Sequence, residues 1–204
     1  MLETENRRER KKAKTKETIY NAALHLFLEK GYEKTTVEEI TEKADVAKGT
    51  FFNHFPSKDA ILFYLGRRRM VLLDEILKDE LNDIPSAKEK LFQYFKILGK
   101  FNEDEKEITS LIVVEIFKNS APLKLGEEES IVSFQAVLNK IIEEGKQQGE
   151  FRADVDSYHV ADILISIYFF TLFYWLEGAC EHLTKELLSR TEVLMTGIEI
   201  HKIG

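Results

Sequence analysis

Apolar residues recur at helical spacing along most of the chain, beginning near its N-terminus. Five of them fall at positions i, i+3, i+4, i+7 and i+8 of one segment: Ile19, Ala22, Ala23, Leu26 and Phe27. One face of an α-helix presents residues at this spacing. Gly31 follows the segment, as a glycine that ends a helix does. The pattern therefore predicts a first helix over residues 13–30.

Two short helices are predicted next. Thr36 and Glu39 have the spacing of a capping box, in which each side chain bonds the backbone of the other residue at a helix N-terminus. The helix that they open would bury Val37, Ile40 and Ala44. After a turn at residues 45–46, another helix over residues 48–54 must end near Phe55, because the following proline disfavours helical geometry at the residue before it.

The rest of the chain has the pattern of longer helices, so the predicted fold is all-α. Ser57 caps a helix that reaches about Leu81, and Pro85 is well placed for the first turn of the next one. Further helices are predicted over residues 86–101, 103–119, 127–148, 156–177 and 181–201. The prediction is a three-helix head with a helix-turn-helix (1–62) and a C-terminal helical bundle (63–204), with about nine helices in total.

Residues 37–44 and 48–54 have the size and spacing of a helix-turn-helix, in which the second helix enters the major groove of DNA. At about 100° per residue, Phe51 and Phe55 fall on one face, toward the core, and Asn53 points almost directly away. The positions around Asn53 carry Gly49, Thr50, Phe52 and His54. Spacing alone leaves two interpretations open: a helix that reads DNA, and a short solvated helix with a polar face.

The outward residues suit base recognition. Asn53 can make a bidentate contact with adenine, and Thr50 offers a hydroxyl and a methyl group to base edges. Gly49 would let the backbone approach DNA closely, although it weakens the helix by about 1 kcal/mol relative to alanine. Thr50 and Asn53 are therefore the predicted base readers.

The motif residues resemble the DNA-binding domain of the TetR family. The resemblance covers residues 16–62 and rests on Gly31-Tyr32, Thr35-Thr36-Val37, Ile40, Ala44, Val46 and the run from Lys48 to Ile61. Residues 149–156 resemble the family's link between its seventh and eighth helices.

The resemblance implies a one-component transcriptional regulator, usually a repressor. Such a protein binds double-stranded DNA at a palindromic operator as a homodimer, and a small molecule bound by the body releases it. Carried over to this chain, the resemblance implies phosphate contacts from Thr36, His54 and Lys58. It also implies that Lys48, Thr50 and Asn53 face the groove.

Three positions depart from the family pattern. Asp45 replaces a turn glycine, which aspartate can do because it tolerates the left-handed backbone region. Ala47 stands where a capping serine is common, and such a cap contributes about 1 kcal/mol. Phe52 replaces a frequent tyrosine and lacks its hydroxyl, although its ring can still pack against a sugar or a thymine methyl group.

The C-terminal half predicts a dimer and an effector pocket. One helical stripe consists of Leu183, Leu187, Thr191, Leu194 and Ile198, and the helix over residues 156–177 is apolar on most sides. Packing within one chain covers part of this surface, and a two-fold contact between protomers would cover the rest. Several aromatic residues either form simple core or line a pocket for an apolar or aromatic effector: Phe92, Phe95, Phe117, Tyr168 and Phe169.

Charge divides unevenly along the 204 residues. Residues 1–69 carry 15 basic and 11 acidic side chains, whereas residues 70–204 carry 14 and 25, for a net charge of −7. A polyanion would therefore bind at the N-terminal end. The basic segment 7–14 is either an arm that adds phosphate contacts or a solvated, frayed terminus.

Motif searches argue against an enzyme. The chain has no GxSxG elbow, no phosphate-binding loop, no GxGxxG after a strand and no HExxH, and its single cysteine and five scattered histidines predict no metal site and no cofactor. A triad of residues distant in sequence stays open, as does a helical protein-interaction module without sequence-specific DNA binding, which Phe52 and Ala47 favour.

Location is expected to be cytoplasmic. The N-terminus lacks the apolar core of a secretory signal. The longest apolar run, residues 163–175, is shorter than the roughly 20 residues that cross a bilayer, so no membrane partner is expected.

Overall fold

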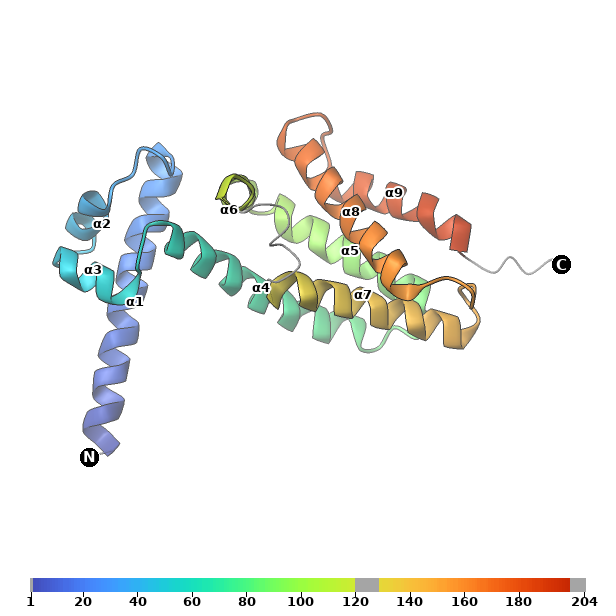
Figure 1. The fold of residues 1–204 in the computed structure, drawn as a ribbon, viewed down its shortest axis with the longest axis horizontal. Coiled ribbons are helices and arrows are strands. Elements are labelled where there is room, and N and C mark those ends of the chain that lie inside the picture. The colour runs from blue at the N-terminus through green and yellow to red at the C-terminus, as the bar shows by residue number, and fades with distance from the viewer. Residues whose placement is uncertain (1, 120–128, 199–204) are drawn as a thin grey trace. The chain divides into compact units, whose positions relative to one another are not determined.

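The computed structural model describes residues 2–119 and 129–198, which form nine α-helices and no β-strand (Figure 1). The predicted all-α fold is therefore confirmed. The helices are α1 (Leu2–Lys30), α2 (Val37–Lys43), α3 (Lys48–His54), α4 (Asp59–Leu81), α5 (Ala87–Glu103), α6 (Lys106–Asn119), α7 (Glu129–Gln148), α8 (Ser157–Leu176) and α9 (Leu183–Ile198). Parts of two predicted helices, residues 127–128 and 199–201, lie outside the described residues.

The chain divides into two compact units. The head unit comprises Met1–Gly66 with Leu111–Ile116, and the body unit comprises Arg67–Ser110 with Phe117–Gly204. Helices α4 and α6 each contribute residues to both units.

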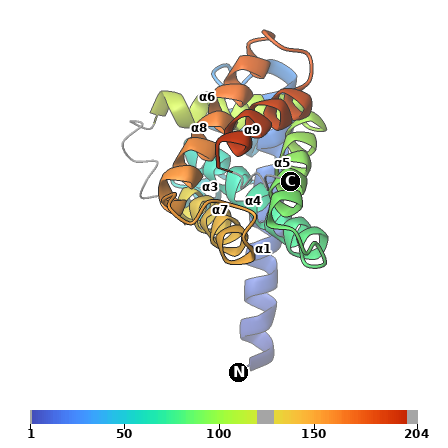
Figure 2. The ribbon, with the colours of Figure 1, turned by 90° about the vertical axis from the view of Figure 1, so that its right-hand side faces the viewer.

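The first helix is longer than its periodicity predicts. The prediction starts it at residue 13, whereas α1 begins at Leu2, and its N-terminal turns extend beyond the other helices of the head unit (Figures 1 and 2). Residues 7–14 are exposed on all sides, so they leave no apolar stripe for a periodicity argument to detect. They form helix nevertheless, because glutamate, arginine, lysine and alanine are strong helix formers. The basic segment 7–14 is thus part of α1.

Side chains from the first three helices form the centre of the head unit. Ile19 and Ala23 of α1, Ile40 of α2 and Phe51 of α3 are all fully buried. Phe55, which directly follows α3, is buried beside them. Helix α3 is therefore held by one apolar side, which fixes the direction in which its other side faces.

The turn between α2 and α3 behaves as the sequence predicts. Asp45 adopts a φ of 52°, in the left-handed region, and the next residue, Val46, donates its backbone N–H to the Thr41 carbonyl at 3.0 Å. Ala47 occupies the N-cap of α3 and makes no side-chain hydrogen bond there. The turn thus keeps its shape without the family's glycine, and α3 begins without a side-chain cap.

Four helices surround the core of the body unit (Figure 2). Helix α5 packs against α7 and α9, and α8 packs against the same two helices. Their fully buried side chains include Leu91, Phe95, Leu138, Leu164 and Leu187. Phe117, one of the aromatic residues considered for an effector pocket, lies outside the described side chains.

The C-terminal stripe lies inside this core. Leu183, Leu187 and Thr191 are fully buried, and Ile198 is almost so. Contacts of α9 with α5 and α8 provide their surroundings. Four of the five stripe residues therefore pack within one chain, whereas Leu194 is half-buried.

Helix α8 is apolar on two opposite faces. Among the described helices, α8 alone has the length and the apolar composition that could cross a membrane. One face, which includes Leu164 and Leu172, is buried in the body core, as in the core helix of a globular domain. The other face exposes 46% of Ile163, 59% of Phe170 and 39% of Tyr174.

Candidate DNA-binding site

The burial of α3 matches its predicted orientation. Phe51 and the adjoining Phe55 face the core, whereas Asn53 is exposed on the opposite side. The rest of the outer face consists of the exposed Lys48, Gly49 and Phe52 and the half-buried Thr50 and His54. The six α3 residues predicted for a DNA contact are thus the ones that the core leaves exposed or half-buried, with Asn53 farthest from Phe51.

Phe52 is the unusual member of this face. Its ring is 48% exposed and packs edge-to-face against the Phe51 ring, with 5.2 Å between the ring centroids. The contact with Phe51 keeps part of the Phe52 ring out of water. The exposed part presents an apolar surface to any molecule that α3 contacts. That surface suits a sugar or a thymine methyl group.

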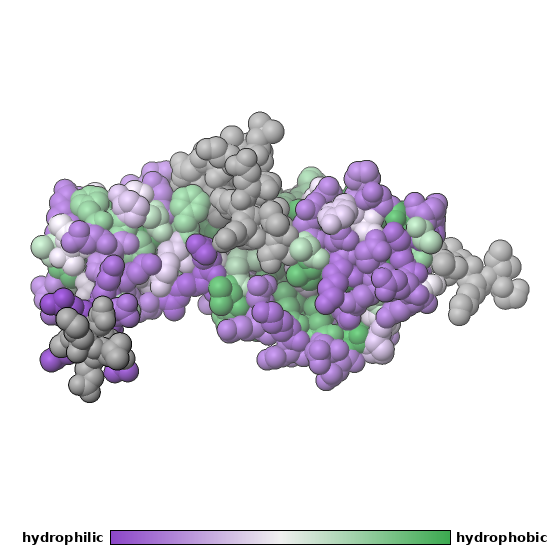
Figure 3. All heavy atoms as spheres, turned by 60° about the horizontal axis from the view of Figure 1, so that its bottom comes forward, coloured by the Kyte–Doolittle hydropathy of each residue, from purple (hydrophilic) through white to green (hydrophobic). Residues whose placement is uncertain are grey.

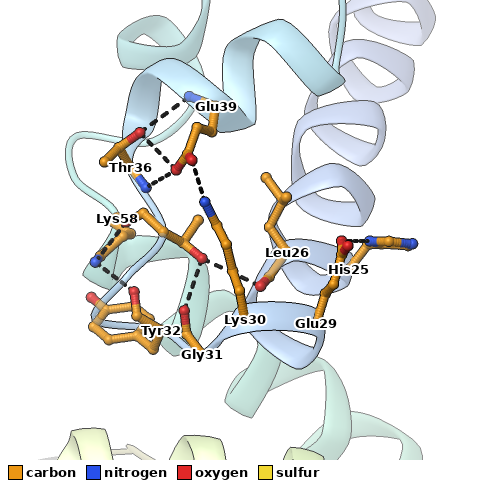
Figure 4. Close-up of polar contacts among 10 residues, drawn as sticks. His25, Leu26, Glu29, Lys30, Gly31, Tyr32, Thr36, Glu39 and Lys58 are labelled. Atoms are coloured by element: carbon orange, nitrogen blue, oxygen red, sulfur yellow. Dashed lines mark hydrogen bonds and ion pairs between the residues drawn. The ribbon is translucent and has the colours of Figure 1, made fainter.

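Thr36 begins α2 through the predicted capping box (Figure 4). The Glu39 backbone N–H donates to Thr36 Oγ1 at 3.3 Å, and the Thr36 backbone N–H donates to Glu39 Oε2 at 2.8 Å. The Lys30 ammonium also pairs with the Glu39 carboxylate and, with the Thr36 bonds, lowers the pKa of Glu39 to about 2. Thr36 is therefore an exposed residue at a fixed position, with a charged carboxylate beside its hydroxyl.

Lys48 pairs with an acidic residue of the neighbouring helix. Its ammonium contacts the Glu38 carboxylate of α2, and this hydrogen bond holds the pKa of Glu38 below its usual value. Both side chains are more than half exposed, so the ion pair contributes little to stability. A phosphate group can replace Glu38 as the partner of Lys48 at small cost. Sequence reasoning missed Glu38, because a pair ten residues apart across a turn has no sequence signature.

His54 lies close to the positive charge of α1. Partial burial, followed by the charges of Lys12 and Lys16, lowers the pKa of its imidazole. The ring is thus neutral at pH 7 and can donate a hydrogen bond without carrying charge. Lys12, which belongs to the basic segment 7–14, and Lys16 thus place positive charge beside His54.

Lys58, predicted to contact a phosphate, also makes hydrogen bonds within the head unit. Its Nζ donates to the backbone carbonyls of Tyr32 at 2.8 Å and Thr35 at 3.0 Å, and it lies 4.0 Å from the centroid of the Tyr32 ring (Figure 4). The ammonium therefore ties the start of α4 to the loop before α2. An ammonium has three donor hydrogens, so these two bonds leave one for another acceptor.

The geometry presents an exposed polar helix with cations beside it. Within the described residues, no three histidine, cysteine, aspartate or glutamate side chains lie close enough together to hold a metal ion. The fold and this helix define a helix-turn-helix regulator with a separate helical body.

Two family models match the chain in succession. The model described as bacterial regulatory proteins, tetR family, matches residues 19–65. The model described as YsiA-like protein, C-terminal region, matches residues 66–186, which is more than half of the chain. The chain belongs to the TetR family of bacterial transcriptional regulators.

Relatives and solved structures agree with this assignment. The fatty acid metabolism regulator protein of Bacillus subtilis is 27% identical over 142 residues, which are 68% of this chain and 71% of that protein. FadR of Thermus thermophilus, a transcriptional repressor solved with lauroyl-CoA, aligns with a TM-score of 0.72 and 26% identity over 92% of this chain and 96% of that one. FadR of Bacillus subtilis, solved with stearoyl-CoA, shares the fold, with a TM-score of 0.75 and 24% identity over 90% and 98% of the two chains.

Proposed function

We propose that this regulator is a repressor that binds a palindromic operator as a homodimer and leaves it when an acyl-CoA thioester binds the body unit. The outward face of α3 carries the proposal, because Asn53 and Thr50 project from a helix that is held by its opposite side. Such a regulator acts in the cytoplasm, where bacterial DNA is found.

The α3 residues divide by chemistry. Asn53 and Thr50 read base edges, and Gly49 and Phe52 permit close apolar approach to the groove. The phosphate contacts come from Lys48, which exchanges Glu38 for DNA, and from His54 and two residues outside α3, Thr36 and Lys58. Phosphate contacts give affinity and register, whereas base contacts give sequence preference.

The exposed face of α8 supports the homodimer. Ile163, Phe170 and Tyr174 recur at helical spacing on this face. Arg190 of α9 lies over two of these rings, 5.0 Å from the Phe170 centroid and 5.1 Å from the Tyr174 centroid. A row of exposed large apolar residues is costly in water. A two-fold contact between copies of the same face buries it without a second partner.

Glutamate substitutions on this face should give monomers. The double variant Ile163→Glu, Phe170→Glu places charges at the centre of the proposed contact, and the body core should stay intact because both side chains are exposed. Sedimentation should report a dimer for the unchanged chain and a monomer for the variant. Val71→Glu, at a 60% exposed position of α4, is the matched control and should remain dimeric. A variant that stays dimeric would place the interface elsewhere.

Two observations support an acyl-CoA effector. The solved relative from Thermus thermophilus binds lauroyl-CoA. The body core consists largely of leucine, isoleucine and aromatic side chains. Hydrophobic residues also reach the surface of this unit (Figure 3). Two bound heads must reach successive major grooves, about 34 Å apart. A ligand releases the DNA if it binds more tightly to a conformation in which the heads cannot do so.

Lauroyl-CoA should lower the fraction of DNA bound, and CoA without an acyl chain should not.

A further inference from the structure

The N-terminal turns of α1 extend beyond the core of the head unit as a continuous helix (Figures 1 and 2). Among the described side chains of this helix, burial begins at Ile19. The basic segment 7–14 lies before that point, and all its side chains are exposed. It carries six basic residues and one acidic residue, Glu9. An exposed, strongly positive helix thus projects from the unit that contains α3.

One side of this helix faces the end of α3. Lys16 Nζ lies 4.0 Å from the centroid of the Tyr64 ring and 5.3 Å from that of Phe55, the residue directly after α3. Residues four apart lie on the same side of a helix. Lys12 and Arg8 therefore continue the row that starts at Lys16.

The electrostatics of α3 agree with this placement. After burial, the positive charge of Lys12 is the next cause of the lowered pKa of the His54 imidazole. His54 is the last residue of α3 and is proposed above to contact a phosphate. The basic row of α1 thus begins beside a proposed phosphate contact.

The spacing and the width of the helix suit the DNA backbone. Arg8 and Lys12 lie about 6 Å apart along the helix axis, at 1.5 Å for each residue. Phosphates of one strand repeat about every 3.4 Å along the duplex axis, so cations four residues apart can meet every second phosphate. A helix with its side chains is about 10–12 Å across, whereas the minor groove is about 6 Å wide. The helix therefore fits against the backbone and does not fit inside this groove.

We propose that the basic segment 7–14 is a preformed helical contact for the phosphate backbone of the operator, in which Arg8 and Lys12 bind phosphates next to the one that His54 reaches. This inference rests on the proposed function, since it extends the DNA-contacting surface of the same head. A segment that is already helical avoids the loss of backbone entropy that a disordered arm incurs on binding. The contact adds affinity and salt dependence without reading sequence.

The double variant Arg8→Gln, Lys12→Gln removes two cations and keeps the helix, because glutamine is as good a helix former as arginine or lysine. Fluorescence anisotropy should show the same loss of affinity for operator and scrambled duplexes, about tenfold or more at low salt. The slope of log affinity against log salt should become shallower by about 4, one unit for each of two contacts in each of two heads. The matched control is Lys96→Gln, Lys100→Gln, which removes two exposed lysines at the same spacing on α5 and should keep the slope.

Ala13→Pro tests whether the helix itself matters. The substitution removes the N–H that bonds the Glu9 carbonyl in α1 and disfavours helical geometry at Lys12. The remaining helix can begin at the substituted proline, which the first helical turn tolerates, so the melting temperature should stay unchanged. All six basic residues remain, yet affinity for both duplexes should fall toward that of the double variant. An unchanged affinity would show that a flexible basic tail is sufficient and would overturn the helical contact.

The other outcomes separate this inference from the proposed function. An unchanged salt slope in the double variant would show that the basic segment 7–14 is a solvated terminus, and would overturn the inference while the proposed function stands. A loss of affinity confined to operators with A·T-rich flanks would indicate minor-groove contact and would also overturn it. If the unchanged protein shows no preference for an operator over the scrambled duplex, the proposed function fails, and the inference that extends it fails as well.

Discussion

The double variant Thr50→Ala, Asn53→Ala should lose most of its preference for the operator over unrelated duplex DNA. A good bidentate base contact contributes about 1–3 kcal/mol of discrimination, so we expect a fall of about 10- to 100-fold in the ratio of specific to non-specific affinity. Non-specific binding should persist and remain sensitive to salt, because Lys48 and the cations of α1 are unchanged. Fluorescence anisotropy with operator and scrambled duplexes measures both affinities.

The fold should survive these substitutions. Asn53 is exposed and Thr50 half-buried, and the core contacts of α3 come from Phe51. Asn82→Ala, at an exposed position in the body unit, is the matched control and should bind the operator normally. An unchanged operator preference in the double variant would refute the assignment of Thr50 and Asn53 as base readers.

Gly145→Ala should destabilise the body unit by about 2 kcal/mol, although alanine is the better helix former. Gly145 lies in α7, and a Cβ there would overlap the Phe151 ring and lie 3.0 Å from Ala87 Cβ. The Phe151 ring is fully buried and cannot move aside cheaply. Overpacking a core commonly costs about 1–3 kcal/mol, which exceeds the gain of about 0.5–1 kcal/mol in helix propensity.

Thermal unfolding measures this loss of stability, with an uncrowded glycine as the comparison. Gly197 of α9 has no atom within 4 Å of the position that a Cβ would take. Gly197→Ala should therefore raise stability slightly, whereas Gly145→Ala should lower the melting temperature by several degrees. Equal melting temperatures for the two variants would show that Phe151 can repack around the added methyl group.

The same contact explains why residues 149–156 form a defined link. The backbone N–H groups of Glu150 and Phe151 donate to the Gly145 carbonyl at 2.9 and 3.1 Å, so the chain folds back over the end of α7. The Glu150 carboxylate then accepts a hydrogen bond from the Lys88 backbone N–H at 2.9 Å and so caps α5. A variant that displaces Phe151 should loosen this cap as well.

Local features of the fold follow from the sequence because their causes are local. The bounds of α3 come from a turn before it and a proline after it. The left-handed Asp45, the missing cap at Ala47 and the inward Phe51 depend on residues within one or two turns of helix. Each feature is set by backbone sterics or by helical periodicity, both of which a sequence displays directly.

Other features depend on residues that only the fold brings together. The charged start of α1 has no amphipathic pattern, so its periodicity could not reveal the extra turns. The partner of Lys48 and the carbonyls that hold Lys58 lie on neighbouring elements. The bond between Asn102 and Tyr168 spans 66 residues of sequence. The α9 stripe has the same pattern for a contact within one chain as for a contact between two.

Selection of bound sequences from a random duplex pool, with and without lauroyl-CoA, tests the central claim most directly. The protein should enrich a palindrome with two half-sites whose centres are about 34 Å apart, and lauroyl-CoA should abolish the enrichment. Enrichment of a palindrome that lauroyl-CoA leaves unchanged would contradict the proposed effector. Recovery of no sequence above background at low salt would contradict the repressor itself and favour a helical protein-interaction module of the same fold.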